Sequence, residues 1–384
     1  MSLREVAVTG IATTPFGKHL DRSLGSLTAE AVAAALDDAG LSPGDVQSAV
    51  FSNAAAGILS GQEMIRGQVA LKGTGLAGIP ILNTENACAS GSAAAHLAWL
   101  SVASGQVDVA IAVGAEKLFH TDKQRSFAAI ESGTDLSLNR DGEDVEGGSV
   151  MMGAYAAAAR AYAAEHGDVA EALAAIAVKN RGFAADNPHA QFRAPITRDD
   201  VEASRPVADP LKLLTCSPLT DGAAALVFTA ARPGDRVRVA VSTLVSYREG
   251  DSVVERSSRE AYRRSGLEPS EIDVFQLHDA CAYAEMIQYE QVGIAEPGKG
   301  AAAVLEGRTG RDGDSPVNTD GGLLSRGHAL GATGLAQLAE LGRQVRGQAG
   351  PRQVDGVRHA LSVNSGGWMG GDYATSIATL LVAA

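Results

Sequence analysis

The amino-acid sequence predicts an α/β protein built from two copies of one unit, with a further segment inserted in the first copy. Continuous apolar stretches of strand length alternate with helical patterns, which is typical of a buried and largely parallel sheet. A short motif also repeats. Residues 39–46 match residues 265–272 at their glycine, leucine, proline, acidic and aliphatic positions, at a constant offset of 226. Such internal similarity indicates a duplicated unit.

The first copy alternates strands with helices. Gly40 follows the first helix, at the position where glycine commonly ends one. We expect strands at Val6–Gly10, Val46–Ser52, Ile79–Leu82, Val107–Gly114 and Leu219–Ala230, and helices at Leu27–Ala39 and Ala93–Val102.

Residues 117–205 interrupt this alternation. The polar, glycine-rich stretch Asp135–Gly148 is followed by two expected helices, Met151–Glu165 and Val169–Arg181. We expect this segment to be an inserted loop domain that covers a functional site. A solvated helical excursion without a ligand remains the alternative.

The second copy begins near Arg236 and repeats the pattern. We expect strands at Val237–Val245, Val274–Leu277 and Ala360–Val363, and helices at Ser252–Ser265 and Leu335–Arg346. The predicted organisation is an N-terminal half (1–116 with 206–235), an inserted domain (117–205) and a C-terminal half (236–384). The loops after the second strand of each copy are equivalent, which gives Asn53 and His278 related positions.

Bulk properties exclude several classes of protein. The chain of 384 residues is long enough for two or three domains or subdomains. Its net charge of −13 argues against general nucleic-acid binding, which needs a basic face. Three cysteines give neither a disulfide framework nor a zinc-site spacing and fit a reducing compartment. With no signal-peptide pattern and no apolar run of about 20 residues, we expect a cytoplasmic protein without a membrane span.

Cys88 is the first candidate functional residue. It lies between an apolar stretch and a helical pattern, where free backbone N–H groups and the helix dipole favour a thiolate. Small neighbours such as Ala87 and Gly91 leave room for a substrate. The alternative is a small buried hydrophobe, as free cysteines usually are.

Three further loops contain candidate residues. His278 follows a strand, His328 precedes a glycine-rich turn and a helix, and Gly366 lies in a glycine-rich loop near the C-terminus. Ligands of open α/β sheets gather at the carboxyl ends of strands. A cysteine with two histidines suits covalent acyl transfer, because an imidazole accepts the thiol proton and the thiolate attacks a thioester. Taken singly, His278 also fits a structural histidine at a strand end, and His328 fits a helix cap.

The motifs together resemble those of the thiolase superfamily, especially the sterol-carrier-protein-type and archaeal acetyl-CoA acetyltransferase-like thiolases. The resemblance covers nearly the whole chain. The stretches that carry it are Asn86–Gly91, His278–Asp279, Gly327–Gly334, Asn187–Arg193 and Ser217–Ala224. It implies two halves in a five-layered α-β-α-β-α fold, an inserted loop domain that binds coenzyme A, and a homodimer or homotetramer. It also implies formation or cleavage of a 3-oxoacyl-CoA.

The same resemblance implies residue roles. Cys88 would carry the acyl group, and His328 would deprotonate it and contribute to an oxyanion hole. His278 would polarise the second acyl-CoA. The N–H groups of Cys88 and Gly366 would form the other oxyanion hole. No metal and no permanently bound cofactor are expected, since coenzyme A and acyl-CoA are substrates; the residues that contact coenzyme A cannot be placed.

The chain departs from the family pattern at the second acid/base cysteine. Many thiolases have Cys-x-Gly where this chain has Asn364-Ser365-Gly366. The sterol-carrier-protein branch usually has His-Asp-Cys-Phe, but here Ala280 precedes Cys281, and a shift of one residue reverses a side chain in an extended segment. His278 or Cys281 could replace the missing base, or a small zinc-ribbon/OB-fold partner subunit could supply it. Ala280 also hints at a bulky acyl group.

Two other functions remain open. One is a retro-aldol lyase on the same fold, against which the retention of Cys88 and His328 argues. The other is a non-catalytic scaffold that keeps the fold, against which the complete Cys-His-His set argues.

Overall fold

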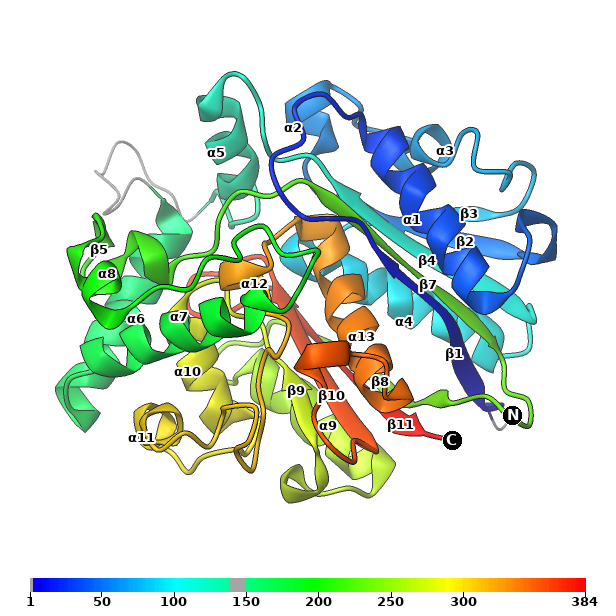
Figure 1. Cartoon of the computed structure of the whole chain (residues 1–384). Helices are drawn as coiled ribbons and strands as arrows, with labels where there is room; N and C mark the ends of the chain where they lie inside the picture. Colours follow the sequence, from blue (N-terminus) through cyan, green and yellow to red (C-terminus); the bar gives the residue numbers. More distant parts are fainter. Residues whose placement is uncertain (1–2, 138–148) are drawn as a thin grey trace.

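A computed structural model describes residues 3–137 and 149–384 (Figure 1). Within these ranges the main sheet has nine strands in the order β3-β2-β4-β7-β1-β8-β11-β10-β9. Its strands are β1 Val6–Thr13, β2 Ser48–Ser52, β3 Ile81–Thr84, β4 Val109–Glu116, β7 Gly222–Ala230, β8 Val237–Ser246, β9 Val274–Gln276, β10 His359–Gly366 and β11 Thr375–Ala383. A separate two-stranded sheet pairs β5 Pro206–Ala208 with β6 Leu211–Lys212.

Helices cover the sheet on both faces. They are α1 Leu24–Ala39, α2 Ala56–Ser60, α3 Arg66–Ala70, α4 Ser90–Ala103, α5 Lys123–Glu131, α6 Val150–His166, α7 Ala170–Ala185, α8 Arg198–Ala203, α9 Val253–Ser265, α10 Ala282–Gln291, α11 Gly300–Leu305, α12 Gly322–Ser325 and α13 Leu330–Arg346. None of the helices in the described ranges is both long and apolar enough to cross a membrane.

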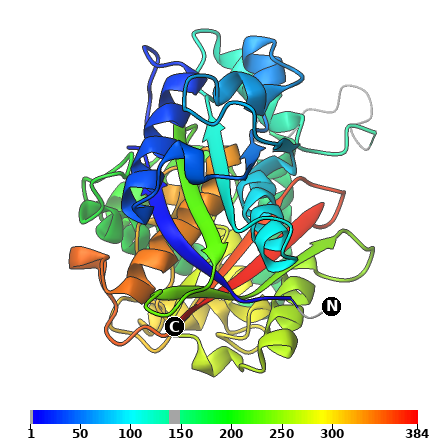
Figure 2. The ribbon, with the colours of Figure 1, turned by 90° about the vertical axis from the view of Figure 1, so that its right-hand side faces the viewer.

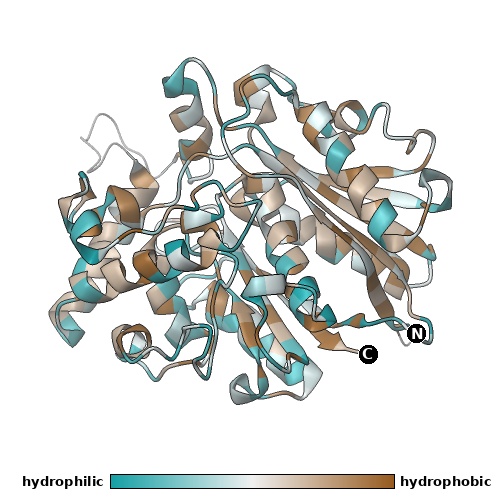
Figure 3. Ribbon diagram, viewed as in Figure 1, coloured by the Kyte–Doolittle hydropathy of each residue, from teal (hydrophilic) through white to brown (hydrophobic). Residues whose placement is uncertain are grey.

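The layers confirm the expected five-layered α-β-α-β-α arrangement. Helix α1 packs on the outer face of the first strand group, and α9 packs on the outer face of the second. Helices α4 and α13 pack against each other and against both groups, so they form the central layer. The two strand groups are seen from the side in Figure 2, with β1, β4 and β7 in its upper part and β10 and β11 in its lower part. Figure 3 shows that the strands of the first group are predominantly apolar.

The prediction of a largely parallel sheet is wrong. Only the pairs β2-β3, β2-β4 and β9-β10 are parallel, and the other strand pairs of the main sheet are antiparallel. The strands are apolar on both sides because helices cover both faces of each group, and this burial does not depend on strand direction.

The duplication is visible in the backbone. Helices α1 and α9 both end at a glycine in the left-handed conformation, Gly40 (φ 64°) and Gly266 (φ 75°). Each is followed by a 3₁₀ turn, at Pro43–Asp45 and Pro269–Glu271, and then by β2 or β9. The offset of 226 is kept throughout. The two copies join in the main sheet at β1 and β8.

Candidate active site

The turn that contains Cys88 is held in a strained conformation. Ala87 has φ 47°, a left-handed value that costs a residue other than glycine about 1–3 kcal/mol. The Glu85 carboxylate accepts from the Ala87 N–H at 2.5 Å, and the Ser90 hydroxyl donates to the Ala87 carbonyl at 2.6 Å. These bonds stabilise the 3₁₀ turn Ala87–Ala89, which holds Cys88 directly before α4.

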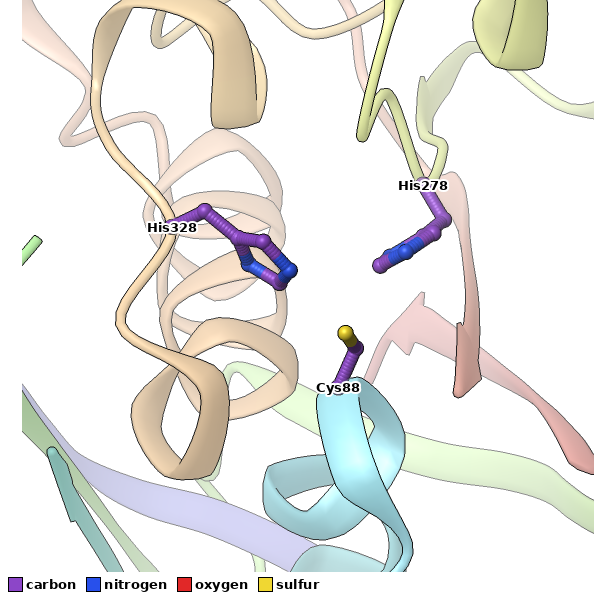
Figure 4. A group of neighbouring side chains, drawn as sticks. All are labelled: Cys88, His278 and His328. Atoms are coloured by element: carbon purple, nitrogen blue, oxygen red, sulfur yellow. The ribbon is translucent and has the colours of Figure 1, made fainter. Parts of the chain in front are cut away.

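Cys88, His278 and His328 meet at one point (Figure 4). Cys88 comes from the turn before α4, His278 from the loop after β9, and His328 from the turn before α13. The Cys88 sulfur and one ring nitrogen of each histidine lie within 4.8 Å of one another. The two imidazole centroids are 5.3 Å apart, and all three side chains are buried. The thiol and the His328 imidazole therefore come from different copies of the repeat.

The hydrogen bonds of His328 fix its tautomer. The Thr333 hydroxyl donates to the Ala329 carbonyl at 3.0 Å, so its oxygen accepts from Nδ1–H of His328 at 2.7 Å. The unprotonated Nε2 therefore faces the site, where it has no hydrogen-bond partner in the described residues. Burial first, then His278 and Arg326, lowers the pKa of His328 well below the usual value. The imidazole is thus neutral and carries an available lone pair.

His278 has the opposite tautomer. The Ser92 hydroxyl donates to Oδ1 of Asn364 at 3.0 Å, which turns the Asn364 amide nitrogen toward Nδ1 of His278 at 3.1 Å. Because Nδ1 accepts this bond, the proton of the neutral ring is on Nε2. Burial lowers the pKa of His278 to about 3, so the ring stays neutral at neutral pH. One imidazole of the pair can accept a proton, and the other can donate a hydrogen bond.

The same three side chains form the kind of cluster that could hold a metal ion. Histidine binds a metal through a lone pair, commonly while its other ring nitrogen donates. His328 satisfies this requirement through Thr333, but His278 accepts at Nδ1 and carries its proton on Nε2. The donor set therefore suits proton transfer and oxyanion binding better than metal coordination.

The thiolate expected from the helix terminus is not the resting form of Cys88. Burial raises the pKa of the thiol to about 12 and outweighs the lowering by the backbone N–H of Cys88 itself. Nearby Glu116 and Glu85 raise this pKa further. The sequence-based expectation was wrong because it counted the helix dipole and not the desolvation of the sulfur. Ionisation of Cys88 thus requires a base, and His328 is in reach.

Cys281 does not belong to the Cys88 cluster. It lies at the start of α10, in the same apolar cluster as Tyr155 and Tyr373. Burial, followed by Cys216, raises its pKa well above the usual value, which keeps it a neutral thiol. Of the two residues considered for the missing base, His278 lies at the site and Cys281 lies outside the cluster.

Gly366 lies against the turn of Cys88. A Cβ atom added at Gly366 would come within 2.2 Å of the Asn86 carbonyl oxygen and 2.5 Å of the Ala89 nitrogen, so only glycine fits this contact. Asn53, in contrast, does not face the site. Its amide donates to Glu116 at 2.7 Å, and the repeat offset aligns it with Asp279, next to His278.

Sequence reasoning missed the residues that orient the site. Thr333 and Asn364 set the two tautomers; both lie in stretches that were compared with the family pattern, Gly327–Gly334 and Asn364-Ser365-Gly366, but neither was assigned a role from the sequence. Tyr373 forms a wall of the site, since its ring meets that of His278 edge to face at 5.7 Å. Its hydroxyl is 3.0 Å from that of Tyr155 on α6, and burial raises the pKa of both phenols.

A hollow of about 260 Å³ opens beside Cys88. Its apolar lining comes from α2, α5, α6 and the start of α13, and its charged groups are Glu63, Arg66 and Glu85. Arg66 already donates to the carbonyls of Asn53 and Ala54 and to the Glu63 carboxylate. The apolar lining residues are Ala54, Ile58, Ala87, Ala129, Ile130, Met151 and Leu330. The hollow has room for an acyl group attached to the sulfur.

Fold and site together define an enzyme of the acyl-transferring α/β class. Residues 6–232 match the family profile of the thiolase N-terminal domain, and residues 247–379 match that of the thiolase C-terminal domain-like family. The chain belongs to the thiolase family. This membership confirms the expected family and the expected class of acyltransferase.

Similar proteins include two that share 37% identity over 95% of this chain. One is the acetyl-CoA acetyltransferase of Methanothermobacter thermautotrophicus, of which 97% is covered. The other is benzoylsuccinyl-CoA thiolase subunit BbsB of Thauera aromatica, of which 95% is covered. Human sterol carrier protein 2 is 32% identical over 95% of this chain, which corresponds to 70% of that protein.

Solved structures share the fold. An aldolase described as Ltp2-ChsH2(DUF35) superimposes with a TM-score of 0.80 at 26% identity and covers 99% of this chain and 98% of its own. Human mitochondrial 3-ketoacyl-CoA thiolase superimposes with a TM-score of 0.73 at 17% identity and covers both chains completely.

Proposed function

We propose that this protein is a thiolase that forms or cleaves a 3-oxoacyl-CoA through an acyl thioester on Cys88. The observation that carries the proposal is the meeting of the Cys88 thiol with two buried imidazoles of opposite tautomer. One supplies a base to the thiol, and the other supplies an N–H for a carbonyl oxygen that gains negative charge.

In the cleavage direction, Nε2 of His328 takes the proton from the thiol of Cys88. The resulting thiolate attacks the 3-oxo carbonyl carbon, and the bond between C2 and C3 then breaks. The acyl group stays on the sulfur, while the electron pair goes to C2 of the departing acyl-CoA. Nε2–H of His278 would stabilise the enolate oxygen of that fragment until C2 takes the proton that His328 removed from the thiol, which returns His328 to its neutral form.

The second half-reaction releases the acyl group. The thiol of free coenzyme A gives its proton to Nε2 of His328 and attacks the acyl carbon on Cys88. The oxyanion that forms would lie between the backbone N–H groups of Cys88 and Gly366. Gly366 suits this role because its backbone is pressed against the start of α4. The sulfur of Cys88 leaves and recovers a proton.

The acyl group would be larger than acetyl. Support comes from the hollow beside Cys88, whose lining combines alanine, isoleucine, methionine and leucine side chains with the charged groups of Glu63, Arg66 and Glu85. Ala280, which suggested a bulky substrate from the sequence, is not among its lining residues. The expectation of a bulky acyl group thus rests on the hollow beside Cys88 and not on Ala280.

Acylation can be tested directly by intact-protein mass spectrometry. After incubation with acetyl-, branched-chain and aromatic acyl-CoAs, we expect the mass of the wild-type protein to rise by one acyl group. The adduct should be absent from Cys88→Ala, while Cys216→Ala, which changes a half-buried cysteine outside the site, should retain it. If none of these acyl-CoAs acylated the wild type, the proposal that this chain acts as a thiolase without a partner would be refuted.

A retro-aldol lyase is the second candidate, favoured by the similarity to the Ltp2-ChsH2(DUF35) aldolase. Products separate the two functions, because a thiolase consumes free coenzyme A and a lyase does not. A small partner subunit is supported by the same structure, whose name contains two proteins, and by the relative named as a subunit. We keep the inserted domain at residues 117–205 and the cytoplasmic location as predictions.

The quaternary structure we propose is a homodimer that pairs through β3. This strand is at one edge of the main sheet, and Leu82 on it is 53% exposed. Met64, Ile65 and Val69, which lie between α2 and the end of α3, add further exposed apolar surface. An open edge beside apolar side chains favours strand pairing with a second copy.

Sedimentation velocity tests this interface. The wild type should sediment as a dimer, and the double variant M64E/L82K should sediment as a monomer, because the edge then buries charge. Leu305→Lys, on α11 and 43% exposed, is the matched control and should remain dimeric. A double variant that remains dimeric would locate the interface elsewhere.

A further inference from the structure

A second, smaller cavity lies behind the turn of His328. Its free space is just large enough for the centre of one water-sized particle. Its wall combines residues after β1, the Asn187–Arg193 stretch and the C-terminal half. The lining residues are Thr13, Thr14, Phe16, Asn187, His189, Asp320, Arg326, Ala336, Glu340 and Arg343. The motif around His189 thus has a structural location that the proposed chemistry does not use.

Arg326 is the first cationic group of this cavity. Its side chain is 3% exposed, and its guanidinium lies over the ring of Phe16 at 5.6 Å. One nitrogen is 3.1 Å from Asp320, without hydrogen-bond geometry. Within the described part of the chain, none of its three guanidinium nitrogens makes a hydrogen bond. Such unmet donors are costly when buried, which indicates a missing acceptor.

Arg343 is the second cationic group. Its one hydrogen bond within the described ranges is a long one, 3.4 Å to the hydroxyl of Thr13, and no carboxylate there lies within 4 Å of it. The carboxylates of the cavity are already engaged. Asp320 accepts from Gln276 and Gly322 and faces Arg326, while Glu340 pairs with Arg352 at 2.9 Å.

The charges in and around the cavity do not balance. Among the lining residues, Arg326 and Arg343 face Asp320 and Glu340, and Arg352, which pairs with Glu340 from outside the lining, adds a third positive charge. The next carboxylates, Asp38 and Asp186, are paired with Arg346 and Arg311. Burial first, then Arg343 and Arg352, lowers the pKa of His189, while Glu30 raises it by less. Within residues 3–137 and 149–384, one positive charge is thus left without a counter-ion in a largely buried place, where an unpaired charge is strongly unfavourable.

We propose that this cavity binds one small monovalent anion of the size of chloride, held by Arg326 and Arg343. The anion supplies the acceptor that the guanidinium groups lack and cancels the excess charge. A polyatomic anion such as sulfate is too large for the available space.

The position of this anion gives it a structural effect. The backbone N–H of Phe16 donates to the His189 carbonyl, and that of Gln191 donates to the Arg326 carbonyl. The anion would therefore lie where the segment after β1, the stretch before α8 and the turn two residues before His328 meet. Its binding should stabilise the folded protein, independently of any catalytic function.

Thermal unfolding of the full-length protein tests the proposal. At constant ionic strength and pH, replacing sodium gluconate by sodium chloride or bromide should raise the Tm saturably, by about 2–5 °C at full occupancy. The variants Arg326→Gln and Arg343→Gln should lose this saturable response. Arg259→Gln, whose side chain is 64% exposed on α9, should keep it.

Crystals of the wild type grown with bromide give a measurement that needs no variant. An anomalous peak between the Arg326 and Arg343 guanidinium groups is the expected result. Equal Tm values in gluconate and chloride, or a water molecule at that position in bromide-grown crystals, would overturn the proposal. A halide response that both glutamine variants retain would show general salt stabilisation and would also overturn it.

Discussion

Replacing His328 with glutamine is expected to slow acylation of Cys88 by about 10²–10⁴-fold, the usual contribution of a positioned general base. The reason is the pKa of about 12 at the thiol, which leaves almost no thiolate at neutral pH without a base. Stopped-flow or quenched mass measurements of the adduct give the rate. If the variant acylated at the wild-type rate, His328 would not be the base.

The variant Thr333→Val tests how much the fixed tautomer of His328 contributes to acylation. It keeps the imidazole and removes the partner of Nδ1, so we expect a smaller loss than in His328→Gln. The pH profile of the wild type adds a second readout. Because the neutral imidazole is the active form and its pKa is lowered, acylation should persist through the range near pH 6.5 and fall only as the pH drops through that lowered pKa. If acylation instead fell with a midpoint near pH 6.5, the pKa of His328 would not be lowered, and this result would contradict the burial of its ring.

Replacing His278 with alanine is expected to impair the carbon–carbon step by about 10²–10³-fold, the usual cost of one oxyanion donor. Simple acylation of Cys88 by an acyl-CoA should change much less, since His278 is assigned to the other substrate. Exchange of the C2 protons of acetyl-CoA in D₂O isolates this step, and acyl-adduct formation reports the first one.

Asn364→Ala is the matched variant for His278. It removes the amide that fixes Nε2–H, so proton exchange should fall by less than in His278→Ala. Equal losses of acylation and exchange in His278→Ala would contradict its assignment to the carbon–carbon step. Loss of exchange with intact acylation would support it.

The sequence predicted the repeated elements well, because short-range signals define them. Helix α9 spans Val253–Ser265, one residue shorter than the expected Ser252–Ser265, and β8 begins at Val237, as expected. Strand β11 was missed, although it pairs with both β8 and β10. The directions of the strands were also predicted wrongly, because a strand that is buried on both faces has the same apolar sequence pattern whether its neighbours are parallel or antiparallel.

In the candidate site, too, some residues could be predicted from the sequence and others could not. Cys88, His278 and His328 were identifiable from residue type and position, and the structure brings them together. Thr333 and Asn364 were not, because their importance comes from contacts that the fold creates. Asn364 meets His278 across 86 positions of the chain, a pairing that no local pattern encodes.

The placement of thiol and base in different repeats has a consequence for how activity arises. The first repeat contains the thiol of Cys88, and the second contains the imidazole of His328. Strands β1 and β8 join the two repeats in the main sheet through one residue pair, Ala7 with Arg238. Packing of α4 against α13 brings the thiol of Cys88 and the imidazole of His328 together. Catalytic competence is therefore an all-or-none property of the assembled chain, and a severed repeat inherits none of it.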